Sequence, residues 1–145
     1  MNLLPIQPTI EENQAFTDNL DCLQNLPMTI DYFNRIGYNP PWIGYYVEKE
    51  GEIVGSAAYK GKPKDGAVEI AYGVFTQHQN KGIGTEICRD LVNLALETDP
   101  TVHIIARTLP EENFSVHILR KNNFKLAGMV YDEEDGDVWE WVYEK

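Results

Sequence analysis

The sequence predicts a mixed α/β fold in which a mostly antiparallel sheet carries helices on both faces. Consecutive strand-like segments imply antiparallel pairing, because short connections join antiparallel neighbours. One strand–helix–strand unit, over residues 67–108, implies a single parallel step. The chain has 145 residues, of which 43% are hydrophobic. This length fits one domain over residues 1–145 and leaves little room for two.

The first third of the chain is helix-like but interrupted. Thr9 and Glu12 have the spacing of a capping box, and apolar residues recur at helical spacing over residues 11–36. Pro27 is expected to interrupt this pattern, and a second short helix is expected to end near Gly37. A loop with two consecutive prolines follows.

Three strand candidates come next, and the first two form a hairpin. Segments 42–48 and 52–60 are separated by Glu50-Gly51, which is suited to a tight turn. After a polar loop rich in lysine and glycine, the third strand is expected over residues 67–75.

The second half of the chain alternates helices and strands. A helix is predicted over residues 82–96, where Ile83, Ile87 and Leu91 form an apolar stripe. Asp99-Pro100 ends this helix. The remaining elements are a strand, a helix and a hairpin, at residues 102–108, 110–122, and 124–131 with 138–143.

The charge of the chain argues against several classes of partner. It has 12 Lys and Arg against 23 Asp and Glu, so its net charge is -11. Such a field repels the phosphates of nucleic acids and favours cationic ligands such as amines.

Two cysteines without a C-x-x-C motif do not suggest a metal site, and no metal is expected. No apolar run approaches the roughly 18 residues of a membrane span, and the first residues lack a basic region. A cytoplasmic protein without a membrane partner is expected.

The most informative stretch is Gln79-Asn80-Lys81-Gly82-Ile83-Gly84, which follows a strand and opens a helix. The first turn of a helix has free N–H groups and a positive dipole end, and glycines let a ligand come close. Together they predict an anion site, most often for phosphate. A dinucleotide fingerprint is disfavoured because Ile87 occupies its third glycine position, and a P-loop because Lys81 precedes the glycine. The plain alternative is a helix start with glycines for tight packing.

This stretch resembles the coenzyme A loop, Gln-x-x-Gly-x-Gly, of the GNAT family of N-acetyltransferases. Residues 112–124 resemble the family pattern Asn-x-x-Ser-x-x-x-x-x-Lys-x-Gly-Phe with a shorter spacing. Asn113 and Ser115 are two positions apart, as in the branch acting on ribosomal-protein N-termini and related amines. Glu69-Ile70-Ala71-Tyr72 resembles the Glu-Ile-Gly-Tyr of that branch. The resemblance spans residues 42–143 and implies a GNAT-like fold.

The resemblance implies acetyl-CoA as co-substrate and direct acetyl transfer to a primary amine of an unidentified small-molecule or peptide acceptor. A backbone N–H near Val74 or Phe75 would stabilise the oxyanion. The hydroxyl of Thr85 would bind the pyrophosphate, and Asn113 would hold the coenzyme or an ordered water. The residues implied to bind the coenzyme are Val74, Phe75, Gln79, Asn80, Lys81, Gly82, Ile83, Gly84, Thr85 and Asn113.

Two residues are implied to act in catalysis. An amine must lose a proton to become nucleophilic, and Glu69 is the candidate base because its family counterpart faces the acceptor. Ser115 is the candidate donor to the thiolate leaving group. Simpler roles stay open: Glu69 as a solvated strand residue, Ser115 as an ordinary first-turn residue, and Asn113 as a helix cap.

The sequence departs from the family pattern at two positions. Asn123 replaces a glycine, and Leu119 stands where many members carry a tyrosine general acid. Because Leu119 lacks a hydroxyl, the hypothesis of a non-catalytic acyl-CoA-binding or regulatory module stays open. The presence of Glu69 and Ser115 favours an enzyme. A protein-interaction domain that uses its acidic surface is a third, weaker hypothesis.

Three further expectations concern the acidic C-terminal segment, the histidines and the assembly. The acids of residues 131–145 are expected to form a solvated hairpin tip, although they could also attract a cationic amine. His78 borders the loop and could contact the coenzyme phosphate, but an exposed loop residue is the favoured expectation; His103 and His117 are expected to be structural. The acceptor and the oligomeric state stay open, and a homodimer is compatible with the sequence.

Overall fold

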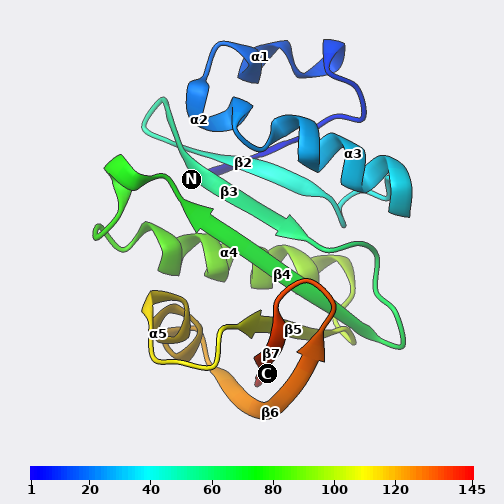
Figure 1. The fold of residues 1–145 in the computed structure, drawn as a ribbon, viewed down its shortest axis with the longest axis vertical. Coiled ribbons are helices and arrows are strands. Elements are labelled where there is room, and N and C mark those ends of the chain that lie inside the picture. Colours follow the sequence, from blue (N-terminus) through cyan, green and yellow to red (C-terminus); the bar gives the residue numbers. More distant parts are fainter.

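The computed structural model describes residues 1–145 and contains a seven-stranded sheet in the order β1-β2-β3-β4-β5-β7-β6 (Figure 1). The strands are β1 (Asn2–Pro5), β2 (Gly44–Lys49), β3 (Glu52–Tyr59), β4 (Ala67–Val74), β5 (His103–Thr108), β6 (Phe124–Asp132) and β7 (Gly136–Tyr143). The helices are α1 (Gln14–Thr17), α2 (Leu20–Leu23), α3 (Leu26–Ile36), α4 (Ile83–Thr98) and α5 (Phe114–Lys121). Short 3-10 turns lie at Glu11–Asn13 and Thr76–His78. None of the helices combines the length and apolar character that a transmembrane segment needs.

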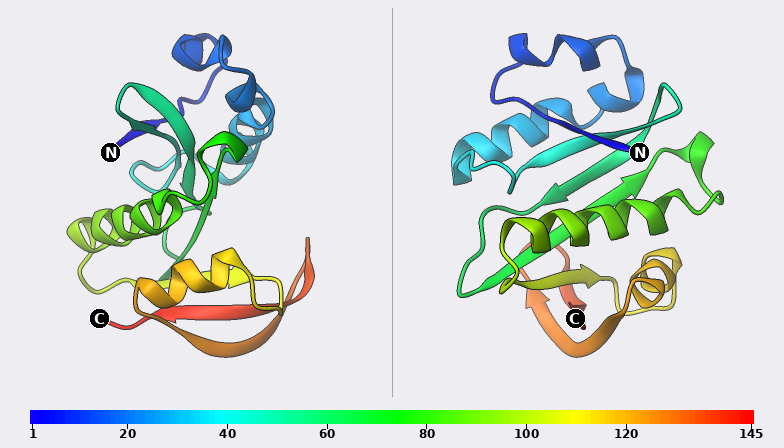
Figure 2. Two further views of the ribbon diagram at one scale, coloured as in Figure 1. Left: turned by 90° about the vertical axis from the view of Figure 1, so that its left-hand side faces the viewer. Right: turned by 180° about the vertical axis from the view of Figure 1, so that it is seen from behind.

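The predicted fold class is confirmed. Every pair of neighbouring strands is antiparallel except β4 and β5, which are parallel and are connected through α4. Helices cover both faces of the sheet: α1 to α3 lie on one side of β2 to β4 and α4 lies on the other (Figure 2). A strand followed by a helix and a parallel strand requires this crossover, as the sequence indicated.

Each face of the sheet has its own apolar core. The α4 face carries a cluster of 23 buried residues, in which Ile87, Cys88 and Leu91 of α4 are fully buried. The other face carries a smaller cluster of five residues beneath α1 to α3. Its members are Ile6, Phe16, Cys22, Leu26 and Tyr46. Burying one such large apolar side chain contributes about 1.5–3 kcal/mol, so the larger cluster provides most of the stabilisation.

The structure corrects the sequence-based expectations at three places. An additional strand, β1, pairs with β2 at the edge of the sheet, and its four residues are too few to show a periodic pattern. Pro27 does not interrupt a helix but lies in the first turn of α3, where a missing N–H costs nothing. The helix expected from residue 110 begins only at Phe114, because the Asn113 side chain caps it by accepting the Val116 N–H at 3.0 Å.

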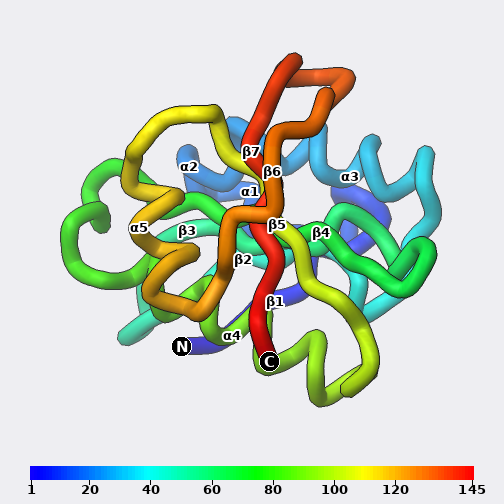
Figure 3. The backbone as a smooth tube through the Cα atoms, turned by 90° about the horizontal axis from the view of Figure 1, so that it is seen from below, coloured from blue at the N-terminus to red at the C-terminus, as the bar shows by residue number.

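The strands β4 and β5 diverge, and this divergence creates the space for a site. Their pairing covers only four residue pairs, from Ala67 with His103 to Ile70 with Ala106. Beyond Ile70, β4 continues to Val74 without β5 beside it. The β6–β7 hairpin crosses beneath the rest of the molecule, with its turn on the side of α1 to α3 and the C-terminus on the side of α4 (Figure 3).

Candidate active site

A first cavity, which we call the loop cavity, opens between β4 and the N-terminal ends of α4 and α5. Its volume is about 650 Å³. The residues that line it are Tyr72, Gly73, Val74, His78, Gln79, Asn80, Gly82, Ile83, Gly84, Thr85, Phe114, Ser115, His117, Ile118 and Lys121. The glycine-rich stretch therefore forms one wall of the cavity, as a ligand-binding loop must.

The backbone of the loop is arranged to present N–H groups. Asn80 and Gly82 both have left-handed conformations, with φ of 65° and 76°. Gly82 is the N-cap of α4, and no side chain caps the first turn of that helix. The N–H groups of this turn are therefore left for an external acceptor. The Gln79 side chain fixes the loop to the strand by donating to the Val74 carbonyl at 3.1 Å.

The two glycines of the loop serve different purposes. At Gly82 the positive φ favours glycine, and a Cβ there would meet nothing within 4 Å. At Gly84 a Cβ would lie 2.6 Å from the Cδ1 atom of Ile118, so this glycine lets α4 and α5 approach each other. The alternative that the glycines serve tight packing therefore describes Gly84 but not Gly82.

The open edge of β4 offers backbone donors to the same cavity. Phe75 and Lys60 donate their N–H groups to the carbonyls of Val54 and Glu69, at 2.9 and 2.8 Å, across the antiparallel β3–β4 pair. Because hydrogen-bonded residues alternate in such a pair, the N–H groups of Tyr72 and Val74 point away from β3. They point toward the gap that β5 has left. Of the two predicted oxyanion donors, Phe75 is therefore engaged within the sheet and Val74 is not.

The loop cavity differs in charge from the chain as a whole. Three basic side chains line it, those of His78, His117 and Lys121, and no Asp or Glu does. In a chain of net charge -11, a cavity without carboxylates is suited to an anionic ligand. His78 is not the exposed residue that the sequence predicted, because its side chain is 14% exposed and lies 3.6 Å from a Glu52 carboxylate oxygen.

A second cavity, which we call the carboxylate cavity, lies where β4 and β5 diverge and beneath the turn of the β6–β7 hairpin. Its volume is about 220 Å³. The residues that line it are Lys60, Glu69, Ile70, Ala71, Tyr72, Ala106, Arg107, Thr108, Ser115, Leu119, Asp132 and Asp135. Only Tyr72 and Ser115 line both cavities, so these two residues mark the boundary between them.

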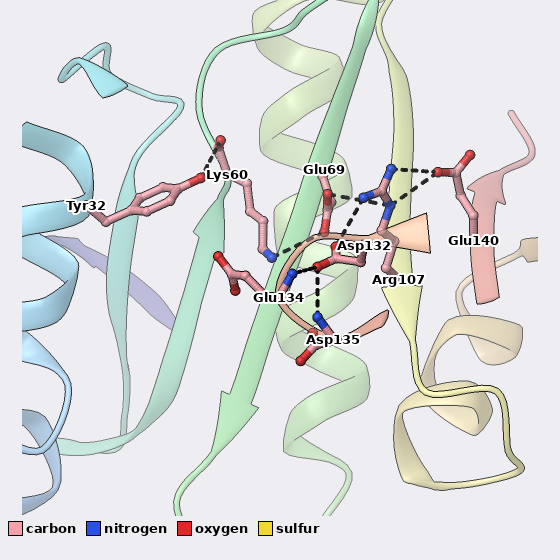
Figure 4. Close-up of polar contacts among 8 residues, drawn as sticks. All are labelled: Tyr32, Lys60, Glu69, Arg107, Asp132, Glu134, Asp135 and Glu140. Atoms are coloured by element: carbon pink, nitrogen blue, oxygen red, sulfur yellow. Dashed lines mark hydrogen bonds and ion pairs between the residues drawn. The ribbon is translucent and has the colours of Figure 1, made fainter. Parts of the chain in front are cut away.

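Glu69 belongs to an ion-pair network rather than to a solvated surface (Figure 4). Its carboxylate, 17% exposed, lies 3.5 Å from Lys60 Nζ and 3.9 Å from Arg107 Nε. Arg107 also donates to Asp132 at 3.1 Å and to Glu140 at 3.3 Å. The sheet register explains the cluster, because Arg107 pairs with Glu140 of β7 and lies two residues beyond the partner of Glu69 on β5.

The network also holds the turn of the hairpin. Asp132 accepts the N–H groups of Glu134 and Asp135 at 2.8 and 3.2 Å, and its other oxygen accepts from Arg107. Asp132 and Glu140 are therefore not part of a freely solvated tip, and that expectation was wrong for these two acids. The turn covers the carboxylate cavity because Arg107 fixes it there.

The environment shifts the pKa values of the network. Burial raises the pKa of Glu69, although Lys60 and Arg107 oppose the rise. Burial alone would lower the pKa of Lys60, but Glu69 and the acids of the turn outweigh it and raise that pKa. The N–H of Glu134 and the Arg107 guanidinium hold the pKa of Asp132 below its ordinary value. Glu69 is thus the carboxylate of the cavity whose affinity for a proton is increased.

The substitution Arg107→Met is expected to destabilise the fold by about 2–3 kcal/mol, because it leaves three carboxylates without their shared cation. This loss is somewhat smaller than that caused by breaking a fully buried ion pair. Ionised Asp132 stabilises the wild type above its unfolded-state pKa, and this contribution is lost as the pH falls through its lowered folded-state pKa. The difference between wild type and variant should therefore shrink as the pH falls below about 4, the ordinary pKa of Asp. Urea denaturation at neutral and acidic pH measures it.

Arg35→Met is the control for this substitution. Arg35 pairs with Asp31 on the surface of α3, where the two side chains are 65% and 71% exposed. Such a pair contributes about 0–1 kcal/mol, so its removal should change little at either pH. An Arg107→Met effect that is equally small, or that does not depend on pH, would contradict the proposed role of the network.

The structure brings most of the predicted site residues together. Those that line the loop cavity are Val74, Gln79, Asn80, Gly82, Ile83, Gly84, Thr85 and Ser115. Glu69 lines the carboxylate cavity, which Ser115 also reaches. Phe75, Lys81 and Asn113 line neither cavity. Lys81 is exposed, and Asn113 is the cap of α5, which is the simpler of the two roles left open for it.

Several lining residues were missed or given other roles by the sequence reasoning. Tyr72 was noted only within a motif, and Lys60 and Arg107 were not singled out. His117 was expected to be structural, yet it lines the loop cavity. A basic residue that recurs at helical spacing on α5, as His117 and Lys121 do, is a signal that could have found them. No group of three or more His, Cys, Asp or Glu is arranged to hold a metal ion.

Comparison with known proteins assigns the fold to a family. Residues 7–125 match the family model described as the acetyltransferase (GNAT) domain. The chain belongs to this family. A Bacillus subtilis (strain 168) protein named uncharacterized N-acetyltransferase YjdG is 29% identical over 93 residues. That match covers 63% of this chain and 52% of the relative, so the chain spans about half the length of the curated relative it matches.

Solved GNAT structures resemble this one over most of the chain. The aminoglycoside acetyltransferase AAC(6')-Ib in complex with coenzyme A is 25% identical, with a TM-score of 0.62 over 71% of this chain and 66% of that one. RimL, a ribosomal alpha-N-protein acetyltransferase, is 17% identical, with a TM-score of 0.72 over 97% and 90% of the two chains. RimL therefore shares the fold, and the resemblance to its branch is confirmed at that level.

Proposed function

We propose that this protein is an N-acetyltransferase that transfers the acetyl group of acetyl-CoA directly to a primary amine. The observation that supports this most is the contrast between the two cavities. The loop cavity is lined by free helix N–H groups and basic residues and by no Asp or Glu, whereas three acids line the carboxylate cavity together with Lys60 and Arg107, and the two cavities share one boundary. An anionic acetyl donor and a cationic acceptor would approach each other there from opposite sides.

The loop would bind the diphosphate of the coenzyme. The left-handed turn at Asn80 and Gly82 and the start of α4, including Thr85, line one side of the cavity. Their N–H groups and the Thr85 hydroxyl would contact the phosphates. The pantetheine arm would run along the open edge of β4 and pair with it as an added strand does. The N–H groups of Tyr72 and Val74 on that edge are the candidates for stabilising the oxyanion.

Glu69 would remove the proton from the acceptor amine through water. Tyr72 lies three positions beyond Glu69 along β4, which corresponds to about 10 Å. This distance is too long for a direct proton transfer or for a single bridging water, so a relay of more than one water would carry the proton. The raised pKa of Glu69 suits a base, because a carboxylate of ordinary pKa holds a proton too weakly.

The ion pairs of Glu69 bear on how an acceptor would enter. On its way to the boundary, an acceptor ammonium would compete with Lys60 Nζ for the Glu69 carboxylate, since both are cations. Arg107 would stay, because Asp132 and Glu140 hold it from two strands.

A thiol-release assay tests the proposed function. The purified chain is incubated with acetyl-CoA and a panel of amines that includes N-terminal peptides, lysine, polyamines, amino acids and aminoglycosides. Turnover with at least one amine is expected. Coenzyme binding without turnover for any amine would instead support a non-catalytic acyl-CoA-binding module, and absence of coenzyme binding would refute both.

A further inference from the structure

The boundary between the two cavities locates the reacting atoms. For an amine to attack a thioester, nitrogen and carbonyl carbon must come within about 3–3.5 Å of each other. If the coenzyme fills the loop cavity and the amine fills the carboxylate cavity, this contact occurs where the cavities meet. Tyr72 and Ser115 are the residues that line both. This step rests on the proposed function.

The Tyr72 hydroxyl lies at this boundary and is only loosely held. Tyr72 projects from the α4 face of β4, on the same face as Ile70 and Val74, toward the first turn of α5. Its hydroxyl points to the carbonyl oxygen of Ser115 at 3.4 Å, which is longer than the roughly 2.5–3.0 Å of an ordinary hydroxyl hydrogen bond. A donor held this weakly can turn to a better acceptor without losing much.

We propose that the Tyr72 hydroxyl donates a hydrogen bond to the sulfur of the coenzyme as the thiolate leaves. In that step the nitrogen–carbon bond forms, the carbon–sulfur bond breaks, and the electron pair stays on sulfur. The ammonium first gives one proton through water to Glu69. Once the nitrogen–carbon bond has formed, the nitrogen gives its second proton to solvent water, and the thiolate later takes its proton from solvent. Tyr72 keeps its own proton, because burial raises its pKa far above neutral pH.

This assignment gives the site two hydroxyls at one boundary. Ser115 brings its hydroxyl from the first turn of α5, and Tyr72 brings one from β4. Leu119, one turn further along α5 and lining the carboxylate cavity, offers no polar group. The leaving thiolate would therefore be stabilised by Tyr72 of β4 as well as by Ser115 of α5.

The variant Tyr72→Phe tests the proposal, since it keeps the ring and removes only the hydroxyl. The thiolate of bound coenzyme A absorbs in the ultraviolet, and a pH titration of that absorbance gives the pKa of the bound thiol. Loss of one hydrogen bond to an anion should raise this pKa by about one unit. In the acetylation assay, kcat should fall about tenfold, while the dissociation constant of coenzyme A should change less than about twofold.

Tyr59→Phe is the matched control. Tyr59 is a buried tyrosine of the same core whose hydroxyl donates to the Leu91 carbonyl, and it lines neither cavity. Its loss should reduce stability but leave the thiol pKa and kcat unchanged. If the wild type binds coenzyme A and Tyr72→Phe alters neither quantity, the proposal for Tyr72 is overturned and the proposed function stands. If the wild type binds no coenzyme A, both fall.

Discussion

Gly82→Trp is expected to weaken the binding of coenzyme A by roughly 100-fold or more. The side chain would enter the space at the start of α4 that the glycine leaves open, where nothing now lies within 4 Å. The diphosphate would then lose its contacts with at least two N–H groups, each worth about 1.5 kcal/mol when the acceptor is charged. Every 1.4 kcal/mol is about a tenfold change in the dissociation constant, which calorimetric titration measures directly.

Gly66→Trp is a closely matched control. Gly66 has φ of 79° against 76° for Gly82, a Cβ at either position would meet nothing within 4 Å, and Gly66 lines neither cavity. Both substitutions should therefore cost about 1–2 kcal/mol of folding stability through the left-handed backbone. Only Gly82→Trp should lose the coenzyme. Equal binding by the two variants would show that the loop does not hold the diphosphate.

Glu69→Gln is expected to lower kcat/KM by roughly 100- to 1,000-fold at neutral pH, within the range of general base catalysis. The wild-type profile should show an acidic limb, because the base works only when ionised and activity falls as the pH drops through its pKa. Burial raises that pKa, so the limb should lie above the range of an ordinary carboxyl group. The variant should lose this limb. A pH series of kcat/KM for both proteins provides the measurement.

Glu140→Gln is the control that distinguishes the loss of a base from the loss of an ion pair in the network. Glu140, like Glu69, pairs with Arg107 and is 22% exposed against 17% for Glu69, but it does not line the carboxylate cavity. This variant should lose some stability and keep its acidic limb. Should Glu69→Gln retain full activity at neutral pH, or should Glu140→Gln lose the limb as well, Glu69 is not the base.

The sequence predicted those parts of the fold whose signals are local. Periodicity located α4 because its apolar stripe repeats over 16 residues. The glycine-rich stretch located the loop because the backbone conformation of such a loop favours glycine. The edge strand β1 has four residues, which is too short for such a signal. The start of α5 depended on one side-chain hydrogen bond, from the Val116 N–H to Asn113.

The acidic half of the site could not be predicted in the same way. Glu69, Arg107 and Glu140 come from three different strands, and their meeting depends on the registers of β4 with β5 and of β5 with β7. Register between distant strands is fixed by tertiary packing and has no local signature. The boundary role of Tyr72 depends on where β5 leaves β4, which the sequence likewise does not mark.

The central claim is that coenzyme A binds in the loop cavity with its sulfur at the boundary of the two cavities. A crystal structure of the complex tests this most directly. We expect diphosphate oxygens within hydrogen-bond distance of N–H groups in residues 79–85, and the sulfur beside Tyr72 and Ser115. A coenzyme bound elsewhere, or one whose sulfur lies away from both residues, would contradict the account.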